Sequence, residues 1–253
     1  MELKIGWLFP DSLYLHGDRG NVLALERAAK QLGYTVTVEK IDFTTEDFTP
    51  MDYDFLFCSP GEIVTFTSIV DYLKPYILAL KAYIKAGRPL LVTGTSMAFW
   101  GTEIHRQDGS IVKGLEIIDL VTTENPAVYG DDLYYRCTLG GETMEVIGNQ
   151  IQMADFEIGE ETAFGELIYG YGNTGKDRKE GVITDNAVFT NTLGPVLVQN
   201  PWMTKAFLKI IAENQEVSVD LTKIDMTLEE KSFATKKDFI LSKTTYLTNC
   251  KND

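Results

Sequence analysis

The sequence predicts an α/β fold with a mostly parallel sheet in its first half and a β-rich second half. Within residues 1–100, short apolar runs alternate with longer segments whose apolar residues recur every three or four positions. After Gly101, short runs of alternating polarity are separated by turn residues. Because a helical segment separates early strands from one another, we expect crossover connections and parallel strand neighbours.

The expected elements follow in order along the chain. Strands are predicted at residues 3–8, 35–40, 54–58 and 90–93, with helices near 21–32 and 67–86 between them. The second half opens with a hairpin turn at residues 107–110, which read Gln-Asp-Gly-Ser. Short strands are then predicted at 115–121, 133–138, 145–147, 167–169, 181–184 and 187–191, and a helix at 202–213. After Lys223, isolated apolar residues in a charged background indicate a docking helix or a loosely held tail.

The composition is that of an ordinary globular chain, since 44% of its 253 residues are hydrophobic and 24% are charged. A formal net charge of -14 opposes binding to nucleic acid phosphates or to anionic membranes. We expect no run that approaches the ~18 apolar residues of a membrane-spanning helix, and residues 1–7 do not resemble a signal peptide. These features predict a cytoplasmic protein whose partners are small molecules or other proteins.

Cysteine and histidine are too sparse for a metal site or a disulfide framework. The chain has three cysteines, Cys58, Cys137 and Cys250, which form no C-x-x-C pair, and two histidines, His16 and His105. The sequence therefore predicts no metal and no cofactor.

Three stretches carry a resemblance to a known family. They are residues 10–25, PDSLYLHGDRGNVLAL; residues 108–119, with Asp-Gly-Ser followed by Gly-Leu-Glu-Ile-Ile-Asp; and residues 164–182, FGELIYGYGNTGKDRKEGV. In order and spacing they resemble the GatD-type glutaminase subunits of bacterial lipid II isoglutaminyl synthase. These subunits belong to the cobyric-acid-synthase-like (CobB/CobQ) branch of class I glutamine amidotransferases.

The resemblance implies a flavodoxin-like layered fold over residues 1–215, with residues 216–253 as an appendage, possibly helical. In that family, a Cys on a strand-to-helix elbow hydrolyses glutamine with the help of a distant His and of backbone N–H groups. The ammonia goes to a Mur-ligase-like partner, which amidates lipid II. The resemblance thus implies a peptidoglycan-related amidation system with a Mur-ligase-like partner.

The residues that would perform this chemistry depart from the family pattern. Aligned with the family's elbow, residues 89–101 place Gly94 at the nucleophile and Ala98 at a substrate-contacting Gln. Residues 191–195, NTLGP, place Leu193 at the general base. The resemblance therefore predicts that the catalytic Cys and His are both missing.

Two further elements differ from the family. The turn after the third strand reads Cys58-Ser59-Pro60-Gly61-Glu62, in which Pro60 removes a backbone donor. The family's N-H-G-G-R segment corresponds to residues 155–160, DFEIGE. We therefore expect a vestigial pocket, defined by Cys58, Gly61, Glu62, Thr95, Ser96 and Ala98.

The favoured interpretation is a non-catalytic subunit that binds a partner protein or a small ligand. One alternative is an active amidotransferase or hydrolase with a relocated nucleophile, for which Cys58, Thr95 and Ser96 are the candidates. A buried, unreactive Cys58 is preferred, because no neighbour that would lower its pKa is evident. Thr95 and Ser96 are interpreted as turn and helix-cap residues, and a free-standing small-molecule sensor is a third possibility.

Two local features have structural interpretations. Residues 170–176 match the phosphate-binding pattern G-x-x-x-x-G-K, but Asp177 stands where a Ser or Thr should bind magnesium, and no helix follows. A solvated turn is predicted there. Near the first helix, Asp18 or Asn21 is expected to cap the helix N-terminus, beside a structural His16.

Overall fold

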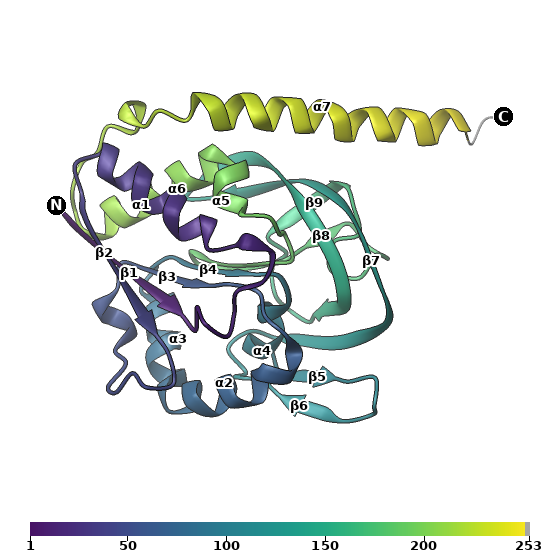
Figure 1. Cartoon of the computed structure of the whole chain (residues 1–253), viewed down its shortest axis with the longest axis horizontal. Helices are drawn as coiled ribbons and strands as arrows, with labels where there is room; N and C mark the ends of the chain where they lie inside the picture. The colour runs from purple at the N-terminus through teal and green to yellow at the C-terminus, as the bar shows by residue number, and fades with distance from the viewer. Residues whose placement is uncertain (251–253) are drawn as a thin grey trace.

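The computed structural model describes the backbone of residues 1–250 and the side chains of residues 1–243. Its centre is a six-stranded sheet in the order β11-β12-β4-β3-β1-β2 (Figure 1). All neighbours are parallel except the edge pair β11 and β12, so the predicted mostly parallel sheet is confirmed. Its strands are β1 (Glu2–Leu8), β2 (Thr35–Ile41), β3 (Phe55–Cys58), β4 (Leu90–Thr93), β11 (Val182–Thr184) and β12 (Ala187–Thr190).

Helices cover both faces of this sheet (Figure 1). In β3, Phe55 and Phe57 belong to the core beneath α1 and α6, whereas Leu56 and Cys58 belong to the core beneath α2, α3 and α4. Both faces of the strand are therefore buried, which explains its continuous apolar run. One layer contains α1 (Gly20–Gln31), α5 (Val196–Gln199) and α6 (Pro201–Asn214), and the other contains α2 (Phe66–Leu73), α3 (Ile77–Lys85) and α4 (Met97–Trp100). Single 3-10 turns are η1 (Leu15–Gly17), η2 (Pro50–Asp52), η3 (Ile63–Thr65), η4 (Lys74–Tyr76), η5 (Gly94–Ser96) and η6 (Leu221–Lys223).

The single helix expected over residues 67–86 is two helices, because Pro75 lies in η4 between α2 and α3. By length and a mean hydropathy of 1.3, the stretch Ile63–Lys85 is nevertheless long and apolar enough to cross a membrane. The expectation that no such run exists is therefore wrong. One such stretch is weak evidence for a span, since core helices pass the same test, and here Phe66 and Tyr83 are fully buried in the core.

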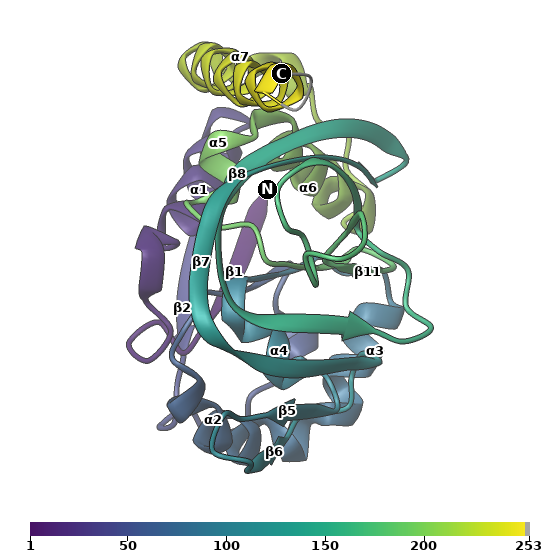
Figure 2. The ribbon, with the colours of Figure 1, turned by 90° about the vertical axis from the view of Figure 1, so that its right-hand side faces the viewer.

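A second sheet, in the order β10-β9-β7-β5-β6 with β8 paired to β7, packs beside the first. Its long β7–β8 hairpin curves around one side of the molecule (Figure 2). The turn predicted at residues 107–110 joins β5 to β6, as expected. The strands are β5 (Glu103–His105), β6 (Ile111–Lys113), β7 (Leu120–Leu139), β8 (Glu142–Ile158), β9 (Gly165–Tyr169) and β10 (Lys179–Glu180).

This hairpin corrects three strand predictions. The runs expected at 133–138 and 145–147 are parts of the much longer β7 and β8, whose register shifts between Glu124 and Tyr129. Pro126 lies in that interval and interrupts the ladder, so the sequence reads as separate pieces. The strand expected at 115–121 begins only at Leu120, because the N–H groups of residues 115–117 donate to carbonyls of residues 99–101 at the end of α4.

The C-terminal helix α7 (Thr227–Cys250) lies across the layer of α1, α5 and α6 and extends over the β7–β8 hairpin (Figure 1). Asp225 precedes it, and its carboxylate accepts hydrogen bonds from the N–H and hydroxyl of Thr227. Phe233 packs on Trp202 with ring centroids 4.3 Å apart, and Ile240 is fully buried. The proposed boundary between residues 1–215 and 216–253 stays a prediction, and the side chain of Cys250 lies outside the described residues.

Candidate functional site

Gly94 and Leu193, the positions aligned with a nucleophile and a base, meet at one edge of the central sheet. Gly94 follows β4, and Leu193 lies shortly after β12, the parallel neighbour of β4. Because parallel strands end at the same edge, residues distant in sequence come together there. A Cβ built on Gly94 would lie 2.6 Å from Leu193 Cδ2.

Gly94 occupies a sharp strand-to-helix turn. Its φ is +59°, and it connects β4 to η5 and then to α4. L side chains rarely adopt this left-handed region, which glycine enters without steric cost. A strained strand-to-helix turn is also the backbone shape of a nucleophile elbow. The chain therefore has the elbow shape with a residue that brings no side chain to it.

Neighbouring side chains fill the space that a nucleophile at residue 94 would need. The Cβ built on Gly94 would also lie 2.7 Å from Pro60 Cβ. Carbon atoms in van der Waals contact lie roughly 3.5–4.0 Å apart. Any larger residue at Gly94 therefore requires Pro60 and Leu193 to move.

Three of the residues assigned to the vestigial pocket, Gly61, Thr95 and Ser96, hold two turns together. The Thr95 hydroxyl donates to the Gly61 carbonyl at 2.6 Å and accepts from the Gly61 N–H at 3.3 Å. The Ser96 hydroxyl donates to the Ser59 carbonyl at 2.6 Å. These bonds join the turn after β3 to the elbow after β4, and neither hydroxyl caps a helix, contrary to the prediction. Ala98 is buried beside them, whereas Glu62 is exposed at the surface.

Cys58 is fully buried at the end of β3. Burial raises the pKa of its thiol to about 12, although the nearby polar groups of Trp100 and Ser96 oppose the shift. Since the thiolate is the reactive form, such a thiol is a poor nucleophile near neutral pH. This favours an unreactive Cys58 over a relocated nucleophile.

Asp18 links three parts of this edge of the sheet instead of capping a helix. It is fully buried, and its carboxylate accepts a 2.5 Å bond from the Thr93 hydroxyl and a 3.2 Å bond from the Gly194 N–H. The expected cap is absent at α1, where Asn21 instead accepts from the N–H of Leu197 at 2.8 Å. Burial raises the pKa of Asp18 to about 6. The G-D-x-G-N segment therefore connects the elbow after β4 to the loop of Leu193 through hydrogen bonds.

Known proteins resemble the chain in sequence over most of its length. The GatD subunit of the lipid II isoglutaminyl synthase (glutamine-hydrolyzing) of Staphylococcus aureus is 29% identical over 229 residues, which cover 90% of this chain and 92% of that protein. The GatD subunit of Streptococcus pneumoniae is 26% identical over 201 residues, 79% of this chain and 76% of that protein. The chain is a GatD homologue. No family model matches it.

The fold of this GatD homologue is that of a glutamine amidotransferase. A crystal structure of a glutamine amidotransferase from Thermotoga maritima superposes with a TM-score of 0.51 at 10% identity, covering 92% of each chain. At this identity the likeness concerns the fold alone. The predicted class I glutamine amidotransferase-like architecture is confirmed.

In this GatD homologue the solvated turn predicted at residues 170–176 is confirmed in part, since Gly175 and Lys176 are exposed, whereas Gly172 and Asn173 are buried and held in place. The side-chain oxygen of Gln150 accepts from the N–H groups of Tyr171 and Gly172 at 3.1 and 3.0 Å. Asn173 is 1% exposed and bonds both the N–H and the carbonyl of Gly181, at 2.6 and 3.1 Å. The sequence does not indicate that Gln150, on β8, holds this turn, because its partners lie 21 and 22 residues away along the chain.

Glu180 is a second buried carboxyl that sequence reasoning missed. It lies in the K-E-G-V frame, is fully buried, and accepts bonds from the Thr190 hydroxyl at 2.5 Å and the Asn191 N–H at 2.9 Å through Oε1. Its Oε2 has no hydrogen-bond partner among the described residues. Burial raises the pKa of Glu180 to about 7. Glu180 supports the end of β12, just before the loop of Leu193.

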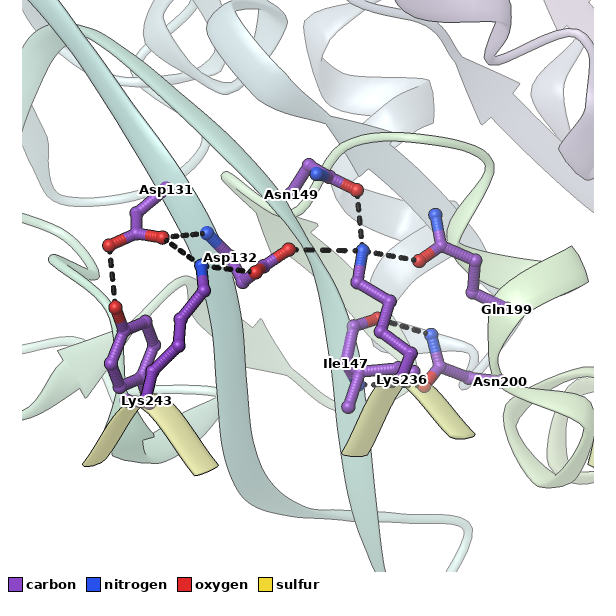
Figure 3. Close-up of polar contacts among 9 residues, drawn as sticks. Asp131, Asp132, Ile147, Asn149, Gln199, Asn200, Lys236 and Lys243 are labelled. Carbon is purple, nitrogen blue, oxygen red and sulfur yellow. Dashed lines mark hydrogen bonds and ion pairs between the residues drawn. The ribbon is translucent and has the colours of Figure 1, made fainter. Parts of the chain in front are cut away.

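The helix α7 is connected to the loop of Leu193 indirectly, through Lys236 and Asn149 (Figure 3). The Lys236 ammonium lies 2.6 Å from Asn149 Oδ1 and 3.2 Å from Gln199 Oε1. Asn149 in turn exchanges both backbone hydrogen bonds with Leu193, at 2.8 and 3.1 Å. Further along α7, Lys243 bonds the carboxylates of Asp131 and Asp132 at 2.9 and 2.6 Å (Figure 3).

The segment aligned with the family's N-H-G-G-R element is a strand end and a turn. Residues 155–158 finish β8, after which the N–H groups of Gly159 and Glu160 donate to the carbonyl and carboxylate of Asp119. Within the described residues, no group of three or more His, Cys, Asp or Glu side chains is placed to share a metal ion. His16 is exposed, with a φ of +59°.

Proposed function

We propose that this GatD homologue is a cytoplasmic, non-catalytic subunit of a lipid II amidation system, and that it pairs with a Mur-ligase-like protein. The sequence likeness to two GatD subunits supports the system to which it belongs. Both relatives are subunits of a lipid II isoglutaminyl synthase, which supports a partner protein for this chain as well. A net charge of -14 supports a protein partner over nucleic acid or an anionic membrane.

One observation carries the non-catalytic part of this proposal. The elbow residue is Gly94, at a φ of +59°, and the side chains of Leu193 and Pro60 occupy the space beside it. Glutamine hydrolysis of the family type requires a thiolate and an adjacent base. Here the aligned base position is a buried leucine that contacts the elbow through an apolar carbon.

The oxyanion side of the site supports the same conclusion. Backbone N–H donors must face the developing charge to stabilise a tetrahedral intermediate. In this chain Pro60 has no N–H, and the Gly61 N–H is donated to the Thr95 hydroxyl. Neither Pro60 nor Gly61, in the turn after β3, therefore offers a free backbone N–H to an oxyanion. The filled space also favours a partner-binding role over a ligand-holding one.

The test is ammonia release from glutamine by the purified chain, with and without the Mur-ligase-like protein of the same organism. We expect no release above background from the native chain in either condition. A Gly94→Cys, Leu193→His variant retains the clash with Pro60, so a Pro60→Gly change is added to it. Glutamine-dependent ammonia release by this triple variant, absent from the native chain, is the expected gain.

Release by the native chain would overturn the proposal and restore the relocated-nucleophile alternative. Cys58→Ala, Thr95→Val and Ser96→Ala variants would then identify the nucleophile, because only the one that attacks glutamine would abolish release. A Cys137→Ala variant is the matched control, since that thiol is also buried and has a pKa raised to about 12 by burial.

A further inference from the structure

An exposed row of lysines runs along α3 and the turn before it. Leu78, Lys81 and Lys85 follow one another at the three- and four-residue spacing that places side chains on one helix face, and Lys74, in η4, precedes Leu78 by four residues. All four side chains are exposed, whereas the opposite face of α3 is buried in the core. Leu78 is 82% exposed, more than any other large apolar residue whose side chain the structure describes. These four residues are called the α3 stripe.

The three lysines of the α3 stripe have no partner within the described chain. None of their ammonium groups forms an ion pair or a hydrogen bond with a described residue. Lys81 and Lys85 are four residues apart on one helix, a spacing at which like charges destabilise the helix. Asp71, the carboxylate that precedes Lys74 by three residues, is exposed and does not pair with it. The stripe is therefore positive charge that the chain itself leaves unneutralised.

The charge of this helical layer is opposite to that of the whole chain. Residues 63–88 contain three lysines and Arg88 but a single carboxylate, Asp71, in a chain of net charge -14. The layer of α2 and α3 lies on the side of the central sheet that faces away from α7 (Figures 1 and 2). At about 0.1 M salt, charges more than about 10 Å apart are largely screened from one another. An anionic surface in contact with α3 therefore meets the lysines before the net charge of the chain.

Exposed apolar side chains accompany the lysines. A cavity of about 500 Å³ between α2 and β6 is lined by Lys74, Ile77 and Ile111 among others, and Ile111 is 53% exposed. Leu78 and Ile111 thus add exposed apolar surface beside Lys74. A lysine can bury its methylene groups along apolar surface while its ammonium stays at a polar boundary. Lysines with exposed apolar residues among them are typical of a helix that lies on a membrane surface.

We infer that the α3 stripe binds the surface of an anionic lipid bilayer, with Leu78 and Ile111 in the interface and the lysines against lipid phosphates. The inference rests on the proposed function, because a system that amidates lipid II works on a lipid. The apolar stretch Ile63–Lys85 then lies on the bilayer and does not cross it, since its Phe66 and Tyr83 are fully buried in the core. A few lysines combined with a small apolar contact give reversible attachment.

The experiment measures co-sedimentation of the purified full chain with lipid vesicles in about 0.1 M salt. Vesicles of phosphatidylcholine alone are compared with vesicles that contain about 30% phosphatidylglycerol. We expect binding to the anionic vesicles that weakens as the salt concentration is raised, and no binding to the neutral ones. Lys81→Gln and Lys85→Gln should each lower the partition coefficient about fivefold, and Leu78→Glu should lower it about tenfold or more.

The matched controls lie on α7, away from the α3 layer. Lys231→Gln removes another exposed lysine, and Leu228→Glu replaces an apolar residue that is 76% exposed. Neither change should alter the binding to vesicles. Thermal melts of every variant exclude loss of binding through unfolding.

Weaker binding to anionic vesicles in the α3 variants, with the α7 controls unchanged, supports the inference. No binding by the native chain, equal binding to both kinds of vesicle, or equal weakening by the α7 controls overturns it. Polyglutamate is a second probe. If the native chain binds polyglutamate but no vesicles, the α3 stripe docks an acidic protein segment and the bilayer is excluded.

The vesicle assay contains neither glutamine nor a partner protein. A negative result therefore overturns the bilayer contact alone and leaves the proposed function standing. Failure of the proposed function is detected separately, by ammonia release from the native chain.

Discussion

Replacing Glu180 by glutamine should remove a pH dependence of stability that originates in the interior. The carboxyl has a pKa of about 7 in the folded chain against an ordinary value of 4.5. A group with a raised folded pKa stabilises the fold when protonated, so its contribution is complete below pH 4.5 and is lost as the pH rises toward 7. At about 1.4 kcal/mol per pH unit, the loss by pH 8 is about 3 kcal/mol.

Glutamine at residue 180 keeps an oxygen for the Thr190 hydroxyl and the Asn191 N–H, and it cannot ionise. The assay is urea unfolding of the native chain and the Glu180→Gln variant at pH 5, 6, 7 and 8. We expect similar stability at pH 5 and a variant that is more stable at pH 8 by up to about 3 kcal/mol. Glu166→Gln is the matched control, because the Glu166 side chain is 75% exposed on the adjacent strand β9. Parallel pH profiles for the native chain and Glu180→Gln would refute the reasoning.

Three further predictions follow from the same structure. Gly94→Ala should lower the free energy of unfolding by about 2–4 kcal/mol, because residue 94 has a φ of +59° and its Cβ would lie too close to Leu193 and Pro60. If Gly94→Ala lowered the free energy of unfolding by the same amount in a Leu193→Ala background, the clash with Leu193 would be contradicted. Lys243→Met should accelerate hydrogen exchange of α7 amides by about fivefold, since the Lys243 ammonium bonds two carboxylates on β7. Lys231→Met is the exposed control. An unchanged exchange rate in Lys243→Met would show that these ion pairs do not help to hold α7 on the rest of the chain. Asp18→Asn should flatten the fall in stability between pH 4 and pH 6, because the pKa of Asp18 is raised from 3.8 to about 6 by burial; urea titrations of a variant that keeps the native slope would contradict this.

The elements of the first half could be predicted from sequence because their signals are local. Each buried parallel strand is a short apolar run, and each covering helix repeats its apolar residues at helical spacing. The second half was harder, because the register shift between Glu124 and Tyr129 interrupts the alternation of a single long strand. The helix break at Pro75 had a local signal that the apolar periodicity on either side obscured.

The candidate site could be predicted in part. Alignment with the family placed Gly94 and Leu193 by motif order, but no local pattern indicates that Pro60 packs on Gly94. Asp18 looked like a helix cap, since Asp commonly precedes a helix. Its actual partners, Thr93 and Gly194, are 75 and 176 residues away along the chain. Glu180 gave no signal of burial, because charged residues are usually exposed.

The sequence by itself determined the layered α/β architecture and the likeness to GatD, and it predicts that Cys and His are missing at the positions aligned with Gly94 and Leu193. Those properties depend on local periodicity and on the order of residues along the chain. Only the tertiary structure decided that Leu193 and Pro60 close the elbow, that Asp18 and Glu180 are buried, and that Asn149 connects α7 to the loop of Leu193. The physical reason is that packing and desolvation depend on which distant segments meet, and parallel strands bring such segments to one edge of the sheet.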